Sequence, residues 1–162
     1  MAKSCMTMSI IISLVALSVA VIAAGKATDP CSLLTLAEIQ EALAKPVKAG
    51  TLKTHASPAA GSDCTFVVGD FGSFNILLKP MYAGETPERI KAQFAKMKMN
   101  PIDLPNVGDA SFFTSPGFNM VQLHTIKGGK YILFTLLISG AKEADVRPKA
   151  EKLMRMAVAR ID

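Results

Sequence analysis

The chain has 162 residues and a formal charge of +5 at pH 7; half of its residues are hydrophobic, and it contains three cysteines and no tryptophan. The lysines and arginines form no run with interleaved aromatic residues, which argues against nucleic-acid binding. The length accommodates one domain with a sizeable core.

The N-terminus has the pattern of a secretory signal peptide. Lys3 precedes an apolar run from about Ile10 to Ala24, and small residues follow that run. The alternative is an uncleaved membrane anchor, but the run lies at the short end of the roughly 17 to 25 residues that a spanning helix needs. Neither Cys5 nor Cys31 ends the run, so a lipid anchor is not expected. We expect residues 1–27 to be removed and residues 28–162 to form a single periplasmic or secreted domain.

Removal of residues 1–27 changes both the charge and the cysteine count. It lowers 18 basic residues to 16 against 13 acidic ones, a net charge of +3, and it leaves only Cys31 and Cys64. An even pair of cysteines in an exported protein favours a disulfide. A closed loop of about 33 residues would stabilise the fold by roughly 3–4 kcal/mol. The alternatives are two buried thiols or a metal pair, the latter disfavoured because neither cysteine has a neighbouring histidine.

The first predicted helix begins after Thr35. The Thr35 hydroxyl and the Glu38 carboxylate have the spacing of a capping box. Three apolar residues, Leu36, Ile39 and Leu43, share one helical face, and Pro46 ends the helix.

Extended segments follow this helix. A weak edge strand is predicted over Val47–Thr54 and a loop over His55–Ser62. Two strands, Cys64–Val68 and Phe74–Lys79, then flank a turn at Gly69–Gly72, as in a hairpin.

The second predicted helix begins with Thr86 as its cap and Pro87 at its first position, and it ends at Asn100. Three apolar residues with i, i+4, i+7 spacing mark its buried face: Ile90, Phe94 and Met97.

The second half of the chain predicts three more strands and a last helix. Ala110–Thr114 alternates, Ser115–Gly117 is expected to turn, and Phe118–Ile126 forms a longer strand. Gly128-Gly129 predicts a tight hairpin into Tyr131–Ile138, whose nearly continuous apolar run suits a central strand covered on both faces. Five residues then share one face of the last helix: Val146, Ala150, Leu153, Ala157 and Ile161. Hairpin connections favour an α+β fold with an antiparallel sheet and the order α-ββ(β)-α-βββ-α.

Three stretches resemble a family of small exported bacterial proteins and lipoproteins of unknown function. They are the opening "DPCSLLTLAEIQEAL" from Asp29, the second cysteine in Gly61–Cys64 ahead of a strand, and "LPNVGDASFF" from Leu104 to Phe113. The resemblance implies an α+β fold with a Cys31–Cys64 disulfide and lends no catalytic residue. The chain departs from the family's lipoprotein form because it lacks a lipobox cysteine.

The expected domain offers few groups for catalysis or metal binding. His124 is predicted on a strand, and with Asp103 or Asp109 it would be the general acid/base pair of an unrecognised enzyme. The chain has no Gly-x-Ser-x-Gly, His-x-x-x-His or Cys-x-x-Cys pattern, so no catalytic residue, metal or cofactor is assigned. Met97 and Met99 have a spacing that would suit a copper-binding protein, but in a helix they point to different sides and are better read as core residues.

Phe71 and Phe118 are the remaining candidates for a binding surface, together with His124. Both phenylalanines adjoin predicted turns and could form an apolar lip; the alternative, which we favour from sequence, is that both rings fold back over the sheet edge. The sequence therefore predicts a non-catalytic binding or accessory module of the cell envelope with an unknown partner or small ligand. Membrane contact is expected only through an uncleaved N-terminal segment.

Overall fold

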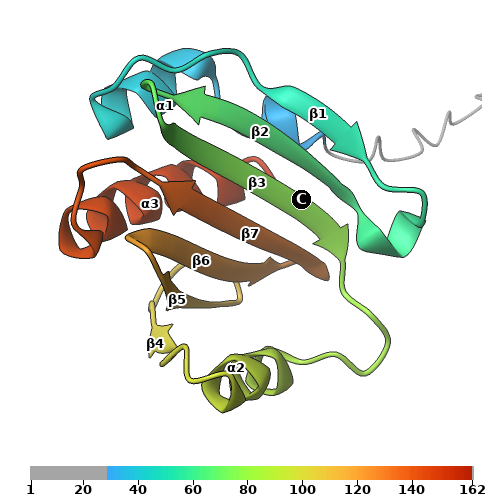
Figure 1. The fold of residues 1–162 in the computed structure, drawn as a ribbon. Coiled ribbons are helices and arrows are strands. Elements are labelled where there is room, and N and C mark those ends of the chain that lie inside the picture. Colours follow the sequence, from blue (N-terminus) through green and yellow to red (C-terminus); the bar gives the residue numbers. More distant parts are fainter. Residues whose placement is uncertain (1–28, 162) are drawn as a thin grey trace, which may run out of the picture.

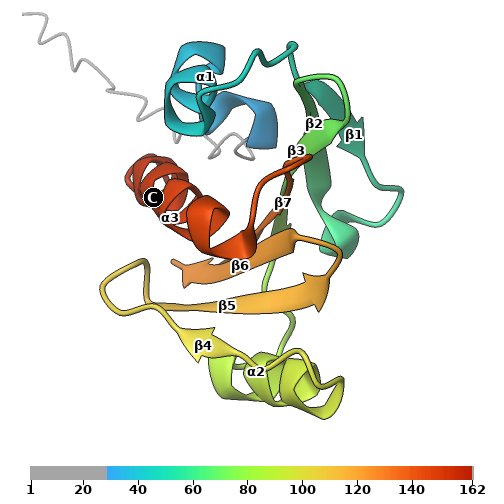
Figure 2. The ribbon, with the colours of Figure 1, turned by 60° about the vertical axis from the view of Figure 1, so that its left-hand side comes forward.

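The structure, a computed structural model, describes residues 29–161, so the predicted signal peptide lies outside the described residues. One antiparallel sheet has α1 and α3 on one face, while α2 lies beside β4 and β5, at the edge of the sheet that β4 forms (Figures 1 and 2). The helices are η1 (Pro30–Ser32), α1 (Leu36–Leu43), η2 (Pro58–Ala60), α2 (Pro87–Lys96) and α3 (Glu143–Val158). The strands are β1 (Thr51–Thr54), β2 (Ser62–Val68), β3 (Gly72–Pro80), β4 (Ile102–Asp103), β5 (Ala110–Gly117), β6 (Met120–Lys127) and β7 (Lys130–Leu137). The expected α+β class is confirmed.

The strand order is β1-β2-β3-β7-β6-β5-β4, with antiparallel pairing throughout. Because β7 pairs with both β3 and β6, it joins the two halves of the chain into one sheet. This explains its apolar sequence: Ile132, Phe134 and Leu136 are completely buried beneath the helices. The β4 strand, only two residues long, was not predicted from the sequence.

The predicted capping box starts α1. The Thr35 hydroxyl accepts a hydrogen bond from the Glu38 amide at 3.3 Å, and the Glu38 carboxylate accepts one from the Thr35 amide at 2.8 Å. The helix ends before Pro46, where Ala44 adopts a left-handed conformation with φ 52°. Arg160, just after α3, donates to both carboxylate oxygens of Glu38, at 2.6 and 2.9 Å, and thus ties the end of the chain to the first helix.

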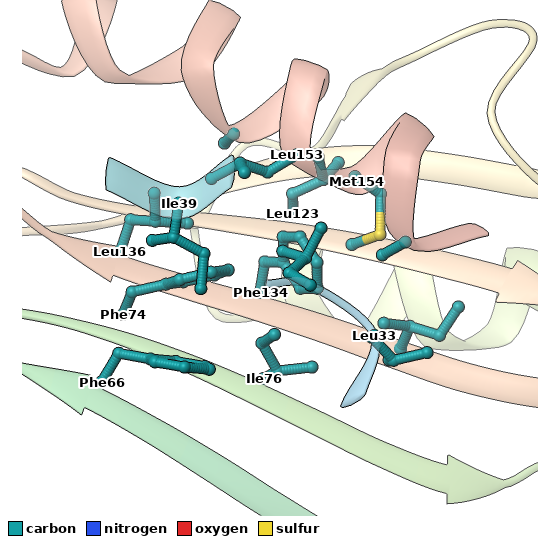
Figure 3. Close-up of a cluster of buried hydrophobic side chains, with 14 of the residues drawn as sticks. Leu33, Ile39, Phe66, Phe74, Ile76, Leu123, Phe134, Leu136, Leu153 and Met154 are labelled. Carbon is teal, nitrogen blue, oxygen red and sulfur yellow. The ribbon is translucent and has the colours of Figure 1, made fainter. Parts of the chain in front are cut away.

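The main core lies between the sheet and the layer formed by η1, α1 and α3 (Figure 3). Phe74 and Phe134 meet edge to face with ring centroids 4.9 Å apart. Ile39 of α1 and Leu153 of α3 cover this pair, and both are fully buried. Each such side chain contributes about 1.5–3 kcal/mol when it leaves water, so this layer supplies most of the hydrophobic stabilisation.

The opposite face of the sheet is covered only in part. Ile90 of α2 packs in a smaller cluster with Phe112, Ile126 and Tyr131, whereas Leu133 and Leu137 on the same face of β7 are only partly buried. The predicted two-sided cover of β7 therefore holds for one end of the strand. Met97 does not belong to the buried face of α2, because the helix ends at Lys96 and the Met97 side chain is 55% exposed.

Candidate functional site

Cys31 and Cys64 form the expected disulfide, with their Cα atoms 5.1 Å apart. Cys31 belongs to η1 and Cys64 is completely buried in β2. The bond ties the N-terminal turn of the domain to the sheet, and both sulfurs are in the oxidised disulfide form. The sequence alternatives of two free thiols or a thiolate metal pair are thereby excluded.

His124 lies on the sheet face beneath α2 and is completely buried. Its Nε2 is 2.8 Å from the Thr114 hydroxyl and its Nδ1 is 2.6 Å from the Tyr131 hydroxyl. The imidazole also stacks on Phe112, with ring centroids 4.6 Å apart, and contacts the ring of Phe94. Burial lowers the pKa of His124 to about 3. The imidazole is therefore neutral at pH 7, and both ring nitrogens are engaged inside the protein.

The two carboxylates considered as partners of His124 are engaged elsewhere. Asp103 of β4 pairs with Lys91 of α2. Asp109 accepts a hydrogen bond from the Gly128 amide at 2.8 Å and so holds the β6–β7 turn. The first contact fixes α2 to β4, and the second holds the β6–β7 turn against the segment that precedes β5.

Phe71 and Phe118 both extend into solvent: Phe71 is 82% exposed and Phe118 is 92% exposed. Neither ring folds back over the sheet edge. Phe71 belongs to the turn between β2 and β3, and Phe118 to the turn between β5 and β6. We name the end of the sheet that carries these two turns the phenylalanine end.

The sheet register places both turns at the same end of the sheet (Figure 1). Ser73, next to the first turn, pairs with Leu137 of β7, and Leu137 pairs with Met120, next to the second turn. The two hairpins are offset by three strand positions, which corresponds to roughly 14 Å. The phenylalanine end thus presents two separate apolar side chains.

The turn that carries Phe118 has an unusual backbone for this residue. Phe118 and Asn119 have φ values of 56° and 57°, between the paired residues Gly117 and Met120. Two consecutive positive φ angles define a type I′ turn, which normally holds Asn and Gly because larger side chains are strained there. The Phe118 ring is exposed, so packing inside the protein does not offset this backbone strain. Strained backbone of this kind is found at functional sites.

A depression with a volume of about 500 Å³ lies at the opposite end of the sheet. Its lining includes the apolar residues Pro58, Leu78 and Pro80, and His55 also lines it. His55 Nε2 is 2.8 Å from an oxygen of Asp63. Sequence reasoning placed His55 in a loop and missed this pair, because loop residues and strand residues meet only through the β1–β2 pairing.

Among the described residues, Met97 and Met99, the candidate copper ligands, are not joined by a group of His, Cys, Asp or Glu side chains that could hold a metal ion. Met97 is exposed and Met99 is partly buried just after α2. Within residues 29–161, no group of three or more His, Cys, Asp or Glu side chains is arranged to hold a metal ion. None of the helices in that range has the length and apolarity required to cross a membrane.

No family model, curated protein or solved structure matches this chain. The resemblance noted in the sequence is thus a prediction that these comparisons leave open, and function has to be argued from the site itself.

Proposed function

We propose that the chain is an exported, non-catalytic binding module of the cell envelope that contacts its partner through the phenylalanine end. The observation that carries this proposal is the exposure of Phe71 and Phe118 on two hairpins at the same end of the sheet. Exposed apolar side chains that gather at one end of a fold mark an interaction surface, and aromatic residues are enriched in protein interfaces.

Two further observations support the proposal. The disulfide fits an oxidising compartment, in agreement with the signal-peptide pattern and with the resemblance to exported bacterial proteins. The His124 imidazole is sealed in the fold by Thr114 and Tyr131, so it contributes stability and presents no proton-transfer atom to solvent.

Site-specific photo-crosslinking in intact bacterial cells tests the proposal. The full chain is produced with benzoylphenylalanine in place of Phe71, Phe118 or Tyr82, one position at a time. Tyr82 is the matched control, because it is 50% exposed and follows β3 at the other end of the sheet. We expect envelope adducts, to either protein or lipid, from Phe71 and Phe118 and far weaker adducts from Tyr82. Equal labelling at all three positions, or none, contradicts the proposal.

A further inference from the structure

We propose that the phenylalanine end docks on an anionic phospholipid surface, with Phe71 and Phe118 entering the lipid and nearby lysines contacting the headgroups. This inference rests on the proposed function and specifies the partner class. The two rings extend from turns at the same end of the sheet, so a single flat surface can receive both.

Exposed lysines lie at the phenylalanine end. Lys48 and Lys45 each line a hollow that Phe71 also lines. Lys142 lies at the start of α3, after the Ile138–Ser139 segment that lines one of these hollows. Lys98 adjoins Met99, whose carbonyl accepts a hydrogen bond from the Ser115 amide close to the Phe118 turn. None of these four lysines is part of an ion pair among the described residues.

The acidic groups at this end are fewer. Asp70 lies in the same turn as Phe71, and Asp145 lies in the first turn of α3. Glu143, beside Lys142, is neutralised by Arg147 at 2.7 Å. The phenylalanine end therefore has an excess of positive charge, which an anionic surface complements.

The shape of the phenylalanine end favours a lipid surface over a folded protein partner. The two rings extend from hairpins that are offset by roughly 14 Å. A rigid protein would need two matching pockets to receive them, whereas a fluid bilayer accepts both. Phenylalanine on one side with lysines around it is the composition of surfaces that lie in the membrane interface. Val67, 41% exposed, together with the partly buried Leu137 and Met120, extends the apolar surface between the two turns.

The absence of tryptophan from the chain makes the test direct, because a single introduced indole is the only one present. Exported protein carrying Phe71→Trp, Phe118→Trp or the control Tyr82→Trp is mixed with vesicles of equal parts phosphatidylglycerol and phosphatidylcholine, or of phosphatidylcholine alone. We expect the emission of the first two variants to shift to shorter wavelength with the anionic vesicles only, and that of Tyr82→Trp to stay unchanged. Because the readout is local, binding through the N-terminal segment would not mimic it.

Vesicle flotation with charge variants tests the role of the lysines. The double variant Lys45→Gln, Lys48→Gln should bind anionic vesicles with an apparent affinity lowered by about fivefold for each lysine at low salt. The control is the double variant Lys53→Gln, Lys127→Gln, which has the same net charge but changes lysines away from the phenylalanine end. Its affinity should stay near the wild-type value. The Phe71→Ser, Phe118→Ser double variant should lose about tenfold or more. Equal binding to both vesicle types, or an equal effect of both lysine pairs, overturns the lipid assignment. Crosslinking to protein alone in cells, with no vesicle binding, would retain the proposed function and reject this inference.

Discussion

The imidazole Nδ1 of His124 lies 2.6 Å from the hydroxyl oxygen of Tyr131, inside a cluster closed by α2. Burial lowers the pKa of His124 to about 3 and raises the pKa of Tyr131 above its usual value. Both groups are neutral in the folded protein at pH 7, and they share one hydrogen bond, while Thr114 engages the second imidazole nitrogen. The pair is a source of pH-dependent stability.

The free energy of unfolding should fall as the pH drops from about 6.5 toward about 3. In this window the unfolded chain protonates His124 while the folded protein does not, because the folded pKa is about 3; the unfolded state therefore binds more protons, and stability decreases with acidification by up to about 1.4 kcal/mol per pH unit. His124→Gln removes the titrating group and should flatten this dependence. Urea unfolding at pH 7, 6, 5 and 4 measures it.

Tyr131→Phe is the matched control for this experiment. It leaves His124 Nδ1 without its hydroxyl partner and should destabilise the protein by about 1–3 kcal/mol, yet the titrating imidazole stays. The variant should keep a steep pH dependence at a lower overall stability. A pH profile that is identical in wild type and His124→Gln would show that His124 does not govern the acid response.

Loss of the Cys31–Cys64 bond should destabilise the domain by roughly 3–4 kcal/mol, because the open chain gains the entropy of a loop that spans 33 residues. The double variant Cys31→Ser with Cys64→Ser, and the wild type in reductant, should both show the loss in urea unfolding. Cys5→Ser is the control, since Cys5 lies in the predicted signal peptide and should leave the stability of the exported domain unchanged. Equal stability of oxidised and reduced protein would contradict the role assigned to the bond.

The sequence predicts well what depends on neighbouring residues. The capping box of Thr35 and Glu38, the Gly128-Gly129 turn and the class of the fold follow from local spacing and are present in the structure. The β5–β6 turn was misplaced, since Ser115-Pro116-Gly117 has turn residues and Phe118 is typical of a strand. In the structure an irregular register between Thr114 and Gly117 keeps these residues in β5, and the turn moves to Phe118-Asn119.

The phenylalanine end could be predicted only as a pair of candidates. Phe71 and Phe118 are 47 positions apart in the sequence, and their relationship depends on the insertion of β7 between β3 and β6. Strand order is set by long-range packing of the core, which a local pattern does not specify. The contact between His55 and Asp63 was missed because it depends on the β1–β2 pairing, and the sequence predicted β1 only as a weak edge strand.

Gly50 should not tolerate a side chain. A Cβ at this position would lie 2.4 Å from Cys64 Sγ and 2.7 Å from a ring carbon of Phe66, both of them buried. Gly50→Ala should therefore lower the free energy of unfolding by about 1–3 kcal/mol, as overpacking of a core does. Ala49→Ser, at the exposed neighbouring position, should change it by no more than about 0.5 kcal/mol. Thermal or urea unfolding of the two variants, side by side, decides whether the space beside the disulfide is as tight as the structure indicates.

Phe118→Asn should stabilise the domain while it weakens contact with a partner surface. Asn accepts the left-handed backbone of residue 118, φ 56°, with little strain, and the ring that it replaces is 92% exposed and adds little to the fold. We expect the free energy of unfolding to rise by about 0.5–1 kcal/mol in urea unfolding. Phe71→Asn is the control, because Phe71 is similarly exposed but has no positive φ; its stability should stay near that of wild type. If the free energy of unfolding rises equally in both variants, removal of an exposed ring explains the rise and backbone strain at Phe118 does not. If it does not rise in Phe118→Asn, the backbone of residue 118 is not strained.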